Sequence, residues 1–204
     1  MRSIFAAALF LLTATLPASA ASSVPKGTYA IDPQHAQVIF MVRHMGLSTF
    51  YGRFGKVKGT LVGDPAAADQ ATLEAQIDMN TVDTHVPELD KELKDGVFDT
   101  AKYPTATFKA TKITVTGENT GTVTGDFTLK GVTKPVTLNV TFNGGRNSPI
   151  PFAPYRIGFD ATGTLKRSDF GLTGYIWGGF VGDDITIAIE AEFDGPLIDP
   201  AAGK

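Results

Sequence analysis

The stretch from Asp83 to Phe108, DTHVPELDKELKDGVFDTAKYPTATF, is where the hydrophobic period of the chain changes. On both sides of it, apolar residues recur at every second position, which is the period of a β-strand. Within it, Val86, Leu89 and Leu93 are spaced three and four residues apart and so share one face of a helix. The sequence therefore predicts one short crossover helix in an otherwise all-β chain.

The ends of this helix carry their own signals. Thr84 is suited to cap the first turn, Pro87 to stand within it, and Gly96 to follow the last helical residue. Tyr103-Pro104 then favours an extended backbone, where the strand pattern resumes. Because the segment is also rich in charge, three roles stay open for it: a lid, a functional site, or a solvated connector.

The strand pattern outside the helix is regular. Ala71 to Met79 alternates most clearly, Phe50 to Val62 reads as one long strand interrupted by glycines, and Asp32-Pro33 is expected to end an opening strand at Ile31. Roughly eight amphipathic strands joined mostly by hairpin loops predict an antiparallel barrel or a sandwich, and closure would remove exposed edges.

Small residues interrupt the apolar faces at mid-strand. They are Ala75, Ala110, Gly125, Ala161, Gly163 and Ala191. If they meet at one height, an eight-stranded barrel keeps an unfilled lumen, which a long apolar ligand would fill. Alternatively, small and large residues merely alternate to fit the taper of a filled barrel. The sequence alone leaves both readings open, because the register between strands is not readable from it.

The N-terminus has the pattern of an export signal. Arg2 precedes an apolar run from Ile4 to Leu12, and Ala18-Ser19-Ala20 is a small-x-small cleavage site. We expect residues 1–20 to be a cleaved signal peptide, with an uncleaved anchor as the alternative, and residues 21–204 to form a single domain. The chain contains no cysteine, which excludes disulfides and sulfur-ligated zinc. Its net charge is -3 without a basic stripe, so nucleic acid is not an expected partner.

Catalytic motifs are not found in the chain, and we expect no catalytic residue, no metal and no cofactor. Asp32, His35 and His44 could be arranged as a metal site, but histidines at strand ends more often make structural hydrogen bonds. Glu88, Asp90 and Glu92 form a carboxylate cluster on the predicted helix. On an exposed helix such a cluster is usually solvated surface.

A second aromatic segment near the C-terminus contains Tyr175, Trp177 and Phe180 between glycines. Such residues can lie at a membrane interface or at the lip of a pocket. The alternative, which we favour, is a loop folded down to plug one end of the barrel, because exposed aromatic side chains favour aggregation.

The chain resembles the YceI-like family over nearly all of residues 21–204. The resemblance is carried by ordered matches at Tyr29-x-Ile31-Asp32, His35-x-x-Val38-x-Phe40, His44, Gly52-x-Phe54, Gly59, Thr81-Val82-Asp83-Thr84, Asp99-Thr100-Ala101-Lys102-Tyr103-Pro104-x-x-x-Phe108, Gly125-Asp126-Phe127-Thr128-Leu129-x-Gly131-Val132-Thr133-Lys134-Pro135-Val136 and Arg167-Ser168-Asp169-Phe170-Gly171. It implies a lipocalin-like eight-stranded antiparallel barrel with one short crossover helix.

The same resemblance implies a periplasmic protein that binds a long isoprenoid, a polyprenyl or quinone-like molecule, in an apolar tunnel without catalysis. The expected role is to sequester or carry this lipid. In some relatives it also implies association with membrane b-type cytochromes, so an accessory interaction module is the first alternative. A small hydrolase or isomerase using His44 or Asp90 is a lesser alternative. The oligomeric state stays open, a dimer included.

From this reading we predict which side chains form the site. The expected tunnel wall is Phe40, Phe54, Ile77, Phe108, Phe127 and Phe159, and the expected lid face is Val86, Leu89 and Leu93. One departure from the family concerns the helix, where relatives commonly carry Arg-Asp-x-His-Leu-Arg. Here Leu89 and Glu92 replace the Arg and the His, so the head group of the ligand is the property that the resemblance transfers least.

Overall fold

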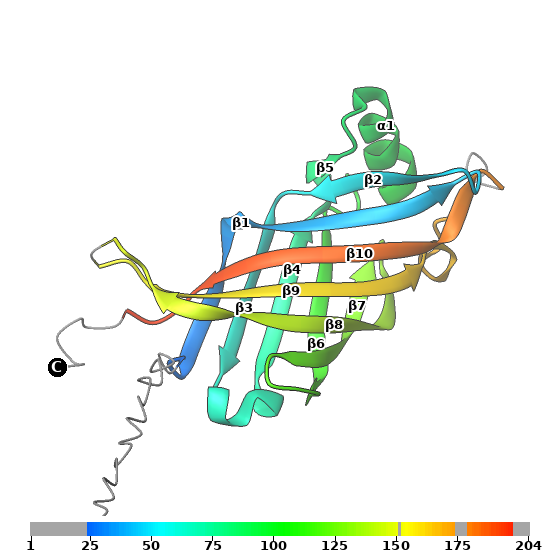
Figure 1. Ribbon diagram of the computed structural model, residues 1–204. Helices are drawn as coiled ribbons and strands as arrows, with labels where there is room; N and C mark the ends of the chain where they lie inside the picture. Colours follow the sequence, from blue (N-terminus) through cyan, green and yellow to red (C-terminus); the bar gives the residue numbers. More distant parts are fainter. Residues whose placement is uncertain (1–23, 151, 174–178, 198–204) are drawn as a thin grey trace, which may run out of the picture.

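The strands predicted from the alternating pattern form one antiparallel sheet that closes on itself (Figure 1). The computed structural model describes residues 24–150, 152–173 and 179–197. The strands are β1 (Gly27–His44), β2 (Ser48–Phe54), β3 (Val57–Gly63), β4 (Thr72–Asp78), β5 (Val82–Asp83), β6 (Thr105–Val115), β7 (Thr120–Leu129), β8 (Val132–Asn147), β9 (Tyr155–Lys166) and β10 (Val181–Asp194). The predicted signal peptide, as well as Tyr175 and Trp177 of the aromatic segment, lie outside the described residues.

These ten labels correspond to eight barrel positions. The first part of β1 pairs with β3 and the second part pairs with β2, so β2 and β3 are two halves of one strand interrupted at Gly55 and Lys56. In the same way, β4 pairs with β3 while β5 pairs with β2. The pairing of β10 with β1 closes the ring, and the predicted eight-stranded antiparallel barrel is confirmed.

The opening strand does not end at Asp32-Pro33, and that prediction was wrong. β1 continues to His44, and its register against β10 shifts between Ile31 and Ala36. Proline cannot donate to the ladder, so it lies in an irregular part of the strand rather than at a break. Asp32 accepts a hydrogen bond from the amide of Gln34 at 2.9 Å, which supports the irregular backbone locally.

The crossover helix begins where predicted and ends later than predicted. α1 (Pro87–Glu92) has Pro87 in its first turn and continues as a wider π-helical turn, η3 (Leu93–Phe98). Gly96 therefore lies within the helix, and Asp99, in the left-handed conformation at φ 51°, terminates it. The remaining short helices are η1 (Pro65–Gln70), η2 (Met79–Thr81) and η4 (Arg167–Phe170).

Thr84 does not cap the helix in the way that we predicted. Its side chain is buried, and Asp90 of α1 reaches back to accept hydrogen bonds from its amide at 2.7 Å and its hydroxyl at 2.6 Å. The carboxylate of Asp90 is thus committed to holding the helix against the strand that precedes it. No helix in the described ranges is long and apolar enough to cross a membrane.

The helical segment closes one end of the barrel. In Figure 1, α1 lies beside β2 and β5, at the opposite end of the molecule from the helical connector between β3 and β4. Leu93 and Phe98 are buried, and Phe98 packs edge-on against Phe54 with ring centroids 5.8 Å apart. Lys130, in the β7–β8 turn, donates to the carbonyl of Val97 at 2.8 Å and fixes the helical segment to the barrel wall.

Candidate functional site

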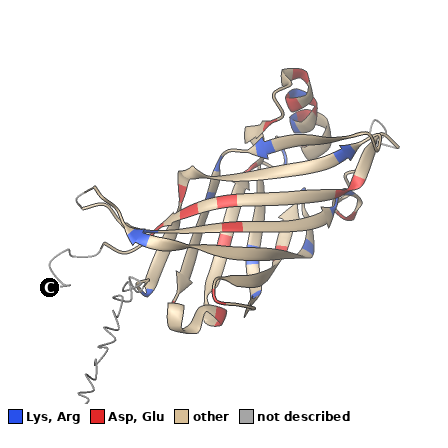
Figure 2. Cartoon of the chain, viewed as in Figure 1, with Lys and Arg blue, Asp and Glu red and all other residues tan. Residues whose placement is uncertain are grey.

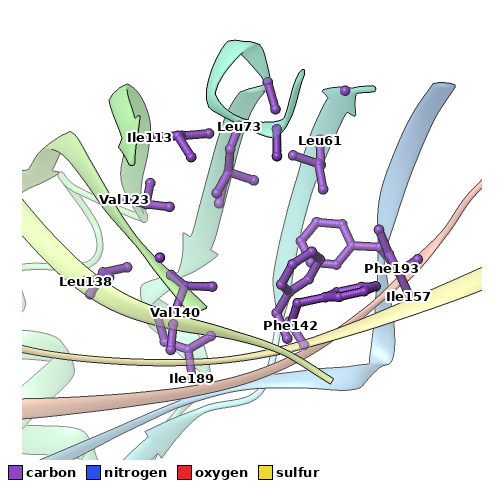
Figure 3. A pocket seen from close by; sticks show the side chains of 18 of the residues that line it. Leu61, Leu73, Ile113, Val123, Leu138, Val140, Phe142, Ile157, Ile189 and Phe193 are labelled. Carbon is purple, nitrogen blue, oxygen red and sulfur yellow. The ribbon is translucent and has the colours of Figure 1, made fainter. Parts of the chain in front are cut away.

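An apolar cavity of about 500 Å³ occupies the interior of the barrel (Figure 3). This volume lies within the range of roughly 300–1,000 Å³ that is typical of small-molecule sites. Side chains from both halves of the barrel wall point into it. Those labelled in Figure 3 are Leu61, Leu73, Ile113, Val123, Leu138, Val140, Phe142, Ile157, Ile189 and Phe193.

The small residues of the interior contribute to the cavity in two different ways. Three of them line it directly: Ala75, Ala161 and Ala191. Gly125 and Gly163 do not, because neighbouring side chains lie flat over them. A Cβ atom on Gly125 would come within 2.5 Å of the ring of Phe108, and one on Gly163 within 2.7 Å of Leu138. These three alanines therefore leave space, whereas the two glycines let large side chains lie against the wall, and Ala110 does not line the cavity.

One wall of the cavity is a row of aromatic rings. The ring centroids of Phe142 and Phe159 are 5.3 Å apart, and those of Phe159 and Phe193 are 5.7 Å apart. Each ring comes from a different strand, β8, β9 and β10; Phe142 and Phe159 are paired in the ladder, whereas Phe193 lies opposite Ile157, two residues from Phe159. Such tilted and edge-to-face pairs are favourable, so this wall holds its shape without a ligand.

The cavity opens at the end of the barrel opposite to the helix α1. The chain segments at its mouth are Val24-Pro25, the connector Gly63–Ala71 that contains η1, and the β6–β7 turn, residues 116–119. The floor lies at the other end, where Phe127 of the lining packs edge-on against the buried Phe170 at 5.4 Å. The cavity is thus a blind pocket with a single described mouth.

Polar groups gather at this mouth. Asp64 accepts from the amide of Ala66 and pairs with Lys26 at 3.2 Å, and these contacts, in that order, lower the pKa of its carboxyl. Burial raises the pKa of Tyr29, and the neighbouring Tyr155 raises it further, so the phenol stays protonated. Its hydroxyl donates to the carbonyl of Pro25 at 2.6 Å and holds the N-terminal segment at the rim.

Four of the six predicted wall residues line this cavity. They are Ile77, Phe108, Phe127 and Phe159. Phe40 and Phe54 point into the barrel but lie beyond its floor, with ring centroids 5.7 Å apart, and Phe40 also covers Gly52. Both belong to the packed end of the barrel, because Phe98 of the helical segment fills the space next to them. That the four lining residues contact a ligand stays a prediction.

The predicted lid face lies at the packed end too. Leu93 is buried, Leu89 is half-buried against the core, and Val86 is 42 % exposed. None of the three lines the cavity. The helix therefore covers the floor end of the barrel, while the mouth is bounded by other segments. Phe98 and Val97, which complete the apolar contact, follow the point at which we expected the helix to end.

Sequence reasoning missed the residues of the mouth. These are Val24, Pro25, Asp64, Pro65, Ala68, Glu118 and Asn119. They lie in connectors, where no alternation marks which side chains face inward. For the Gly63–Ala71 connector and the β6–β7 turn, the sequence offered one signal: each is a short segment between two amphipathic strands. That signal predicts a connection between strands but not which end of the barrel stays open.

The histidine and carboxylate candidates lie outside the cavity. Asp32 and His35 meet at 2.7 Å and lie close to Glu192, whereas His44 lies at the far end of β1. Burial alone would raise the pKa of Asp32, but hydrogen bonds from His35 and Gln34 and the charges of His35 and Arg156 outweigh it, and the pKa is lowered. A cation already occupies this carboxylate, since Arg156 binds it at 2.9 Å.

Comparison with known proteins identifies this barrel. The model of the YceI-like domain matches residues 29–193. The chain belongs to the YceI-like family. A UPF0312 protein of Pseudomonas savastanoi pv. phaseolicola is 41% identical over 171 residues, covering 82% of this chain and 86% of that protein.

Two solved structures show how closely the YceI-like fold is kept. BcnA of Burkholderia cenocepacia superposes with a TM-score of 0.70 at 27% identity, covering 79% of this chain and 98% of that one. A polyisoprenoid binding domain from Saccharophagus degradans superposes with a TM-score of 0.63 at 20% identity, covering 82% and 98%. The second likeness bears on the fold alone.

The two residues at which this YceI-like chain departs from the expected helix motif, Leu89 and Glu92, both lie at the closed end of the barrel. Leu89 packs against the core at the floor end of the barrel. Glu92 is half-buried, and its Oε1 atom is enclosed without a hydrogen-bond partner among the described residues. Both positions lie away from the cavity lining, so in this chain neither side chain is placed to meet the mouth end of a bound molecule.

Proposed function

We propose that this protein binds a long isoprenoid chain in the barrel cavity. The observation that carries the proposal is a blind pocket of about 500 Å³ whose interior is built from hydrocarbon side chains and whose polar groups lie at the mouth. An empty apolar cavity costs stability, and a chain of apolar units would restore the missing contacts. Membership of the YceI-like family supports this reading.

The proposed role is to sequester or carry the lipid in the periplasm. The export pattern of residues 1–20 supports this location. A carrier of this kind would exchange its ligand with a membrane, and a b-type cytochrome remains a proposed partner in that setting. The lesser alternative, a hydrolase or isomerase, needs polar groups inside the pocket, and its two named candidates, His44 and Asp90, do not line it.

Organic extraction of the purified protein, followed by mass spectrometry, tests the proposal directly. The extract should contain a prenyl lipid in near-stoichiometric amount. Replacing Val140, which points into the cavity, by tryptophan should abolish the recovered lipid, because the indole would occupy the ligand volume. The matched control is Val62→Trp, at a β3 position outside the lining and 45 % exposed, which should leave the lipid content unchanged.

Repeated extractions that yield no prenyl lipid would contradict the proposal. So would equal lipid recovery from Val140→Trp and wild type when both fold with the same circular dichroism spectrum. Recovery of a straight-chain fatty acid or amide in place of a prenyl lipid would retain the binding function and replace its ligand class.

A further inference from the structure

The cavity mouth has a charge pattern that bears on which end group a ligand can carry. Among the described residues, no Lys, Arg or His lines the cavity, and the two charged residues that line it are both acidic, Asp64 and Glu118. Figure 2 colours acidic positions red on the η1 connector and on the β6–β7 turn, the two hairpin ends that border the opening.

The described cations offset only one of these two negative charges. Lys26 is already paired with Asp64 at 3.2 Å. Lys112 precedes the lining residue Ile113 on β6, so strand alternation turns its exposed side chain to the outer face of the barrel. Glu118 has no ion-pair partner among the described residues, and the mouth therefore presents an uncompensated negative charge.

The polar atoms at the mouth suit an uncharged group. The side-chain amide of Asn119 makes no hydrogen bond within the described part of the chain, although its backbone carbonyl accepts from the amide of Phe142 at 2.8 Å. An amide offers both donors and an acceptor, which fits a hydroxyl or a carbonyl equally well. Thr120 and Thr122 also border the cavity, but they alternate with the inward Val123, so strand alternation turns their hydroxyl groups to the outer face.

The opposite orientation, with the polar end at the floor, is unfavourable. The inward side chains near the floor include Val38, Val57, Ile77, Phe127, Leu165 and Ile187, while strand alternation turns the side chain of Gln37, next to Val38, to the outer face. None of these inward side chains can donate or accept a strong hydrogen bond, so a buried hydroxyl would lose its water contacts without replacement and a buried phosphate would lose far more. The polar end of a bound chain therefore stays at the mouth.

We propose that the cavity selects isoprenoids with an uncharged hydrogen-bonding end, such as a hydroxyl or a quinone carbonyl, over those that end in a phosphate. This selectivity rests on the proposed isoprenoid binding and adds the chemistry of the end group. The acidic mouth repels a phosphate dianion, while the side-chain amide of Asn119 can bind a neutral oxygen.

The test compares a polyprenol with the polyprenyl monophosphate of the same chain length on delipidated full-length protein, by displacement of a fluorescent prenyl probe. The polyprenol should bind at least about tenfold more tightly, and the gap should narrow as salt screens the mouth. The preference should fall in the order wild type, Glu118→Gln, Glu118→Lys. Glu118 lies at the exposed apex of a turn, so these changes are compatible with folding.

A matched control separates local from global charge. Glu88→Lys makes the same exchange on exposed helix α1, at the closed end of the barrel, and should leave the preference unchanged. Equal or tighter binding of the phosphate by wild type would overturn the selectivity while isoprenoid binding stands. An equal shift from Glu88→Lys would overturn the role of the mouth. Binding of neither molecule would overturn isoprenoid binding itself, and the selectivity with it.

Discussion

At the scale of single residues, Arg156 forms ion pairs with three carboxylates where the barrel closes. Its guanidinium lies 2.9 Å from Asp32 of β1, 3.2 Å from Glu192 and 2.9 Å from Asp194, both of β10. The three carboxylates come from the two strands whose pairing closes the ring, and Arg156 comes from the next strand, β9. Since Asp32 is almost fully buried, its charge depends on these partners.

Replacing Asp32 by asparagine should therefore lower the free energy of unfolding by about 1–3 kcal/mol at pH 7, the scale of a charged hydrogen bond. The pKa of Asp32 is lower in the folded state than its ordinary value of 3.8, so this stabilisation is present above that value and is lost as pH falls through the folded-state pKa. Urea unfolding of wild type and Asp32→Asn at a series of acidic pH values measures the difference in their free energies of unfolding. A difference that stays constant with pH would contradict the assignment.

Glu190 shows the opposite behaviour on the outer face of the same strands. A hydrogen bond with Asp160, burial and the charge of Asp160 together raise its pKa. A carboxyl whose pKa is raised on folding loses stability as pH rises, because the folded state prefers the protonated form. Glu190→Gln should therefore raise the melting temperature at pH 8 and leave it nearly unchanged at pH 4. Calorimetry at both values checks this, and a variant that is less stable at pH 8 would refute it.

At the scale of elements, the crossover helix shows what periodicity can and cannot predict. Its position and its apolar spacing were readable, because three- and four-residue spacing differs from strand alternation. Its end was not, because the chain passes Gly96 in a π-helical turn that buries Phe98. The tertiary contact with Phe54 outweighs the local signal of glycine. Likewise, the spacing identified an apolar face without revealing which end of the barrel it covers.

This placement predicts how helix variants behave. Leu93→Ala should lower the free energy of unfolding by about 2–5 kcal/mol, because it removes a buried side chain from the packed end. Val86→Ala, at an exposed position of the same segment, should change it by no more than about 0.5 kcal/mol. Denaturant unfolding measures both.

The same pair distinguishes a floor from a lid. Under conditions where Leu93→Ala is fully folded, its rate of lipid exchange should equal that of wild type, because the mouth is bounded by other segments. Stopped-flow transfer of a fluorescent prenyl lipid to vesicles measures this rate. Faster exchange in Leu93→Ala, with Val86→Ala unchanged, would restore the lid reading.

At the scale of the whole molecule, the alternating pattern predicted a barrel or a sandwich, and the family resemblance pointed to the eight-stranded barrel that the structure shows. Neither predicted which inward side chains leave space in its interior. Ala75 and Gly125 looked alike in the sequence, as small inward residues, but one leaves space and the other is covered by Phe108. The difference depends on the cross-strand partners, and the register that sets them is a long-range property. Phe40 and Phe127 likewise share an inward face but lie on opposite sides of the floor.

A ligand that fills the cavity should stabilise the entire barrel, because its wall strands are continuous around the ring. Delipidated protein should melt at a lower temperature than protein as purified. A polyprenol at one hundred times its dissociation constant should add about 2.7 kcal/mol, or roughly 5–11 °C for a chain of this size. Differential scanning calorimetry with a range of polyprenol concentrations measures this. A melting temperature independent of polyprenol would argue against occupancy of the cavity.

The chain segments on either side of the barrel meet beside the cavity mouth. A Cβ atom on Gly27 would come within 2.6 Å of Pro196, the amide of Tyr155 donates to the carbonyl of Pro196, and Val24-Pro25 lines the rim. Since the sequence has no cysteine, one introduced at Leu197, which is 72 % exposed, is a unique attachment point for a thiol-reactive dye. A dye at this position lies next to the segments that border the mouth, so we expect its fluorescence to change when lipid enters or leaves the cavity.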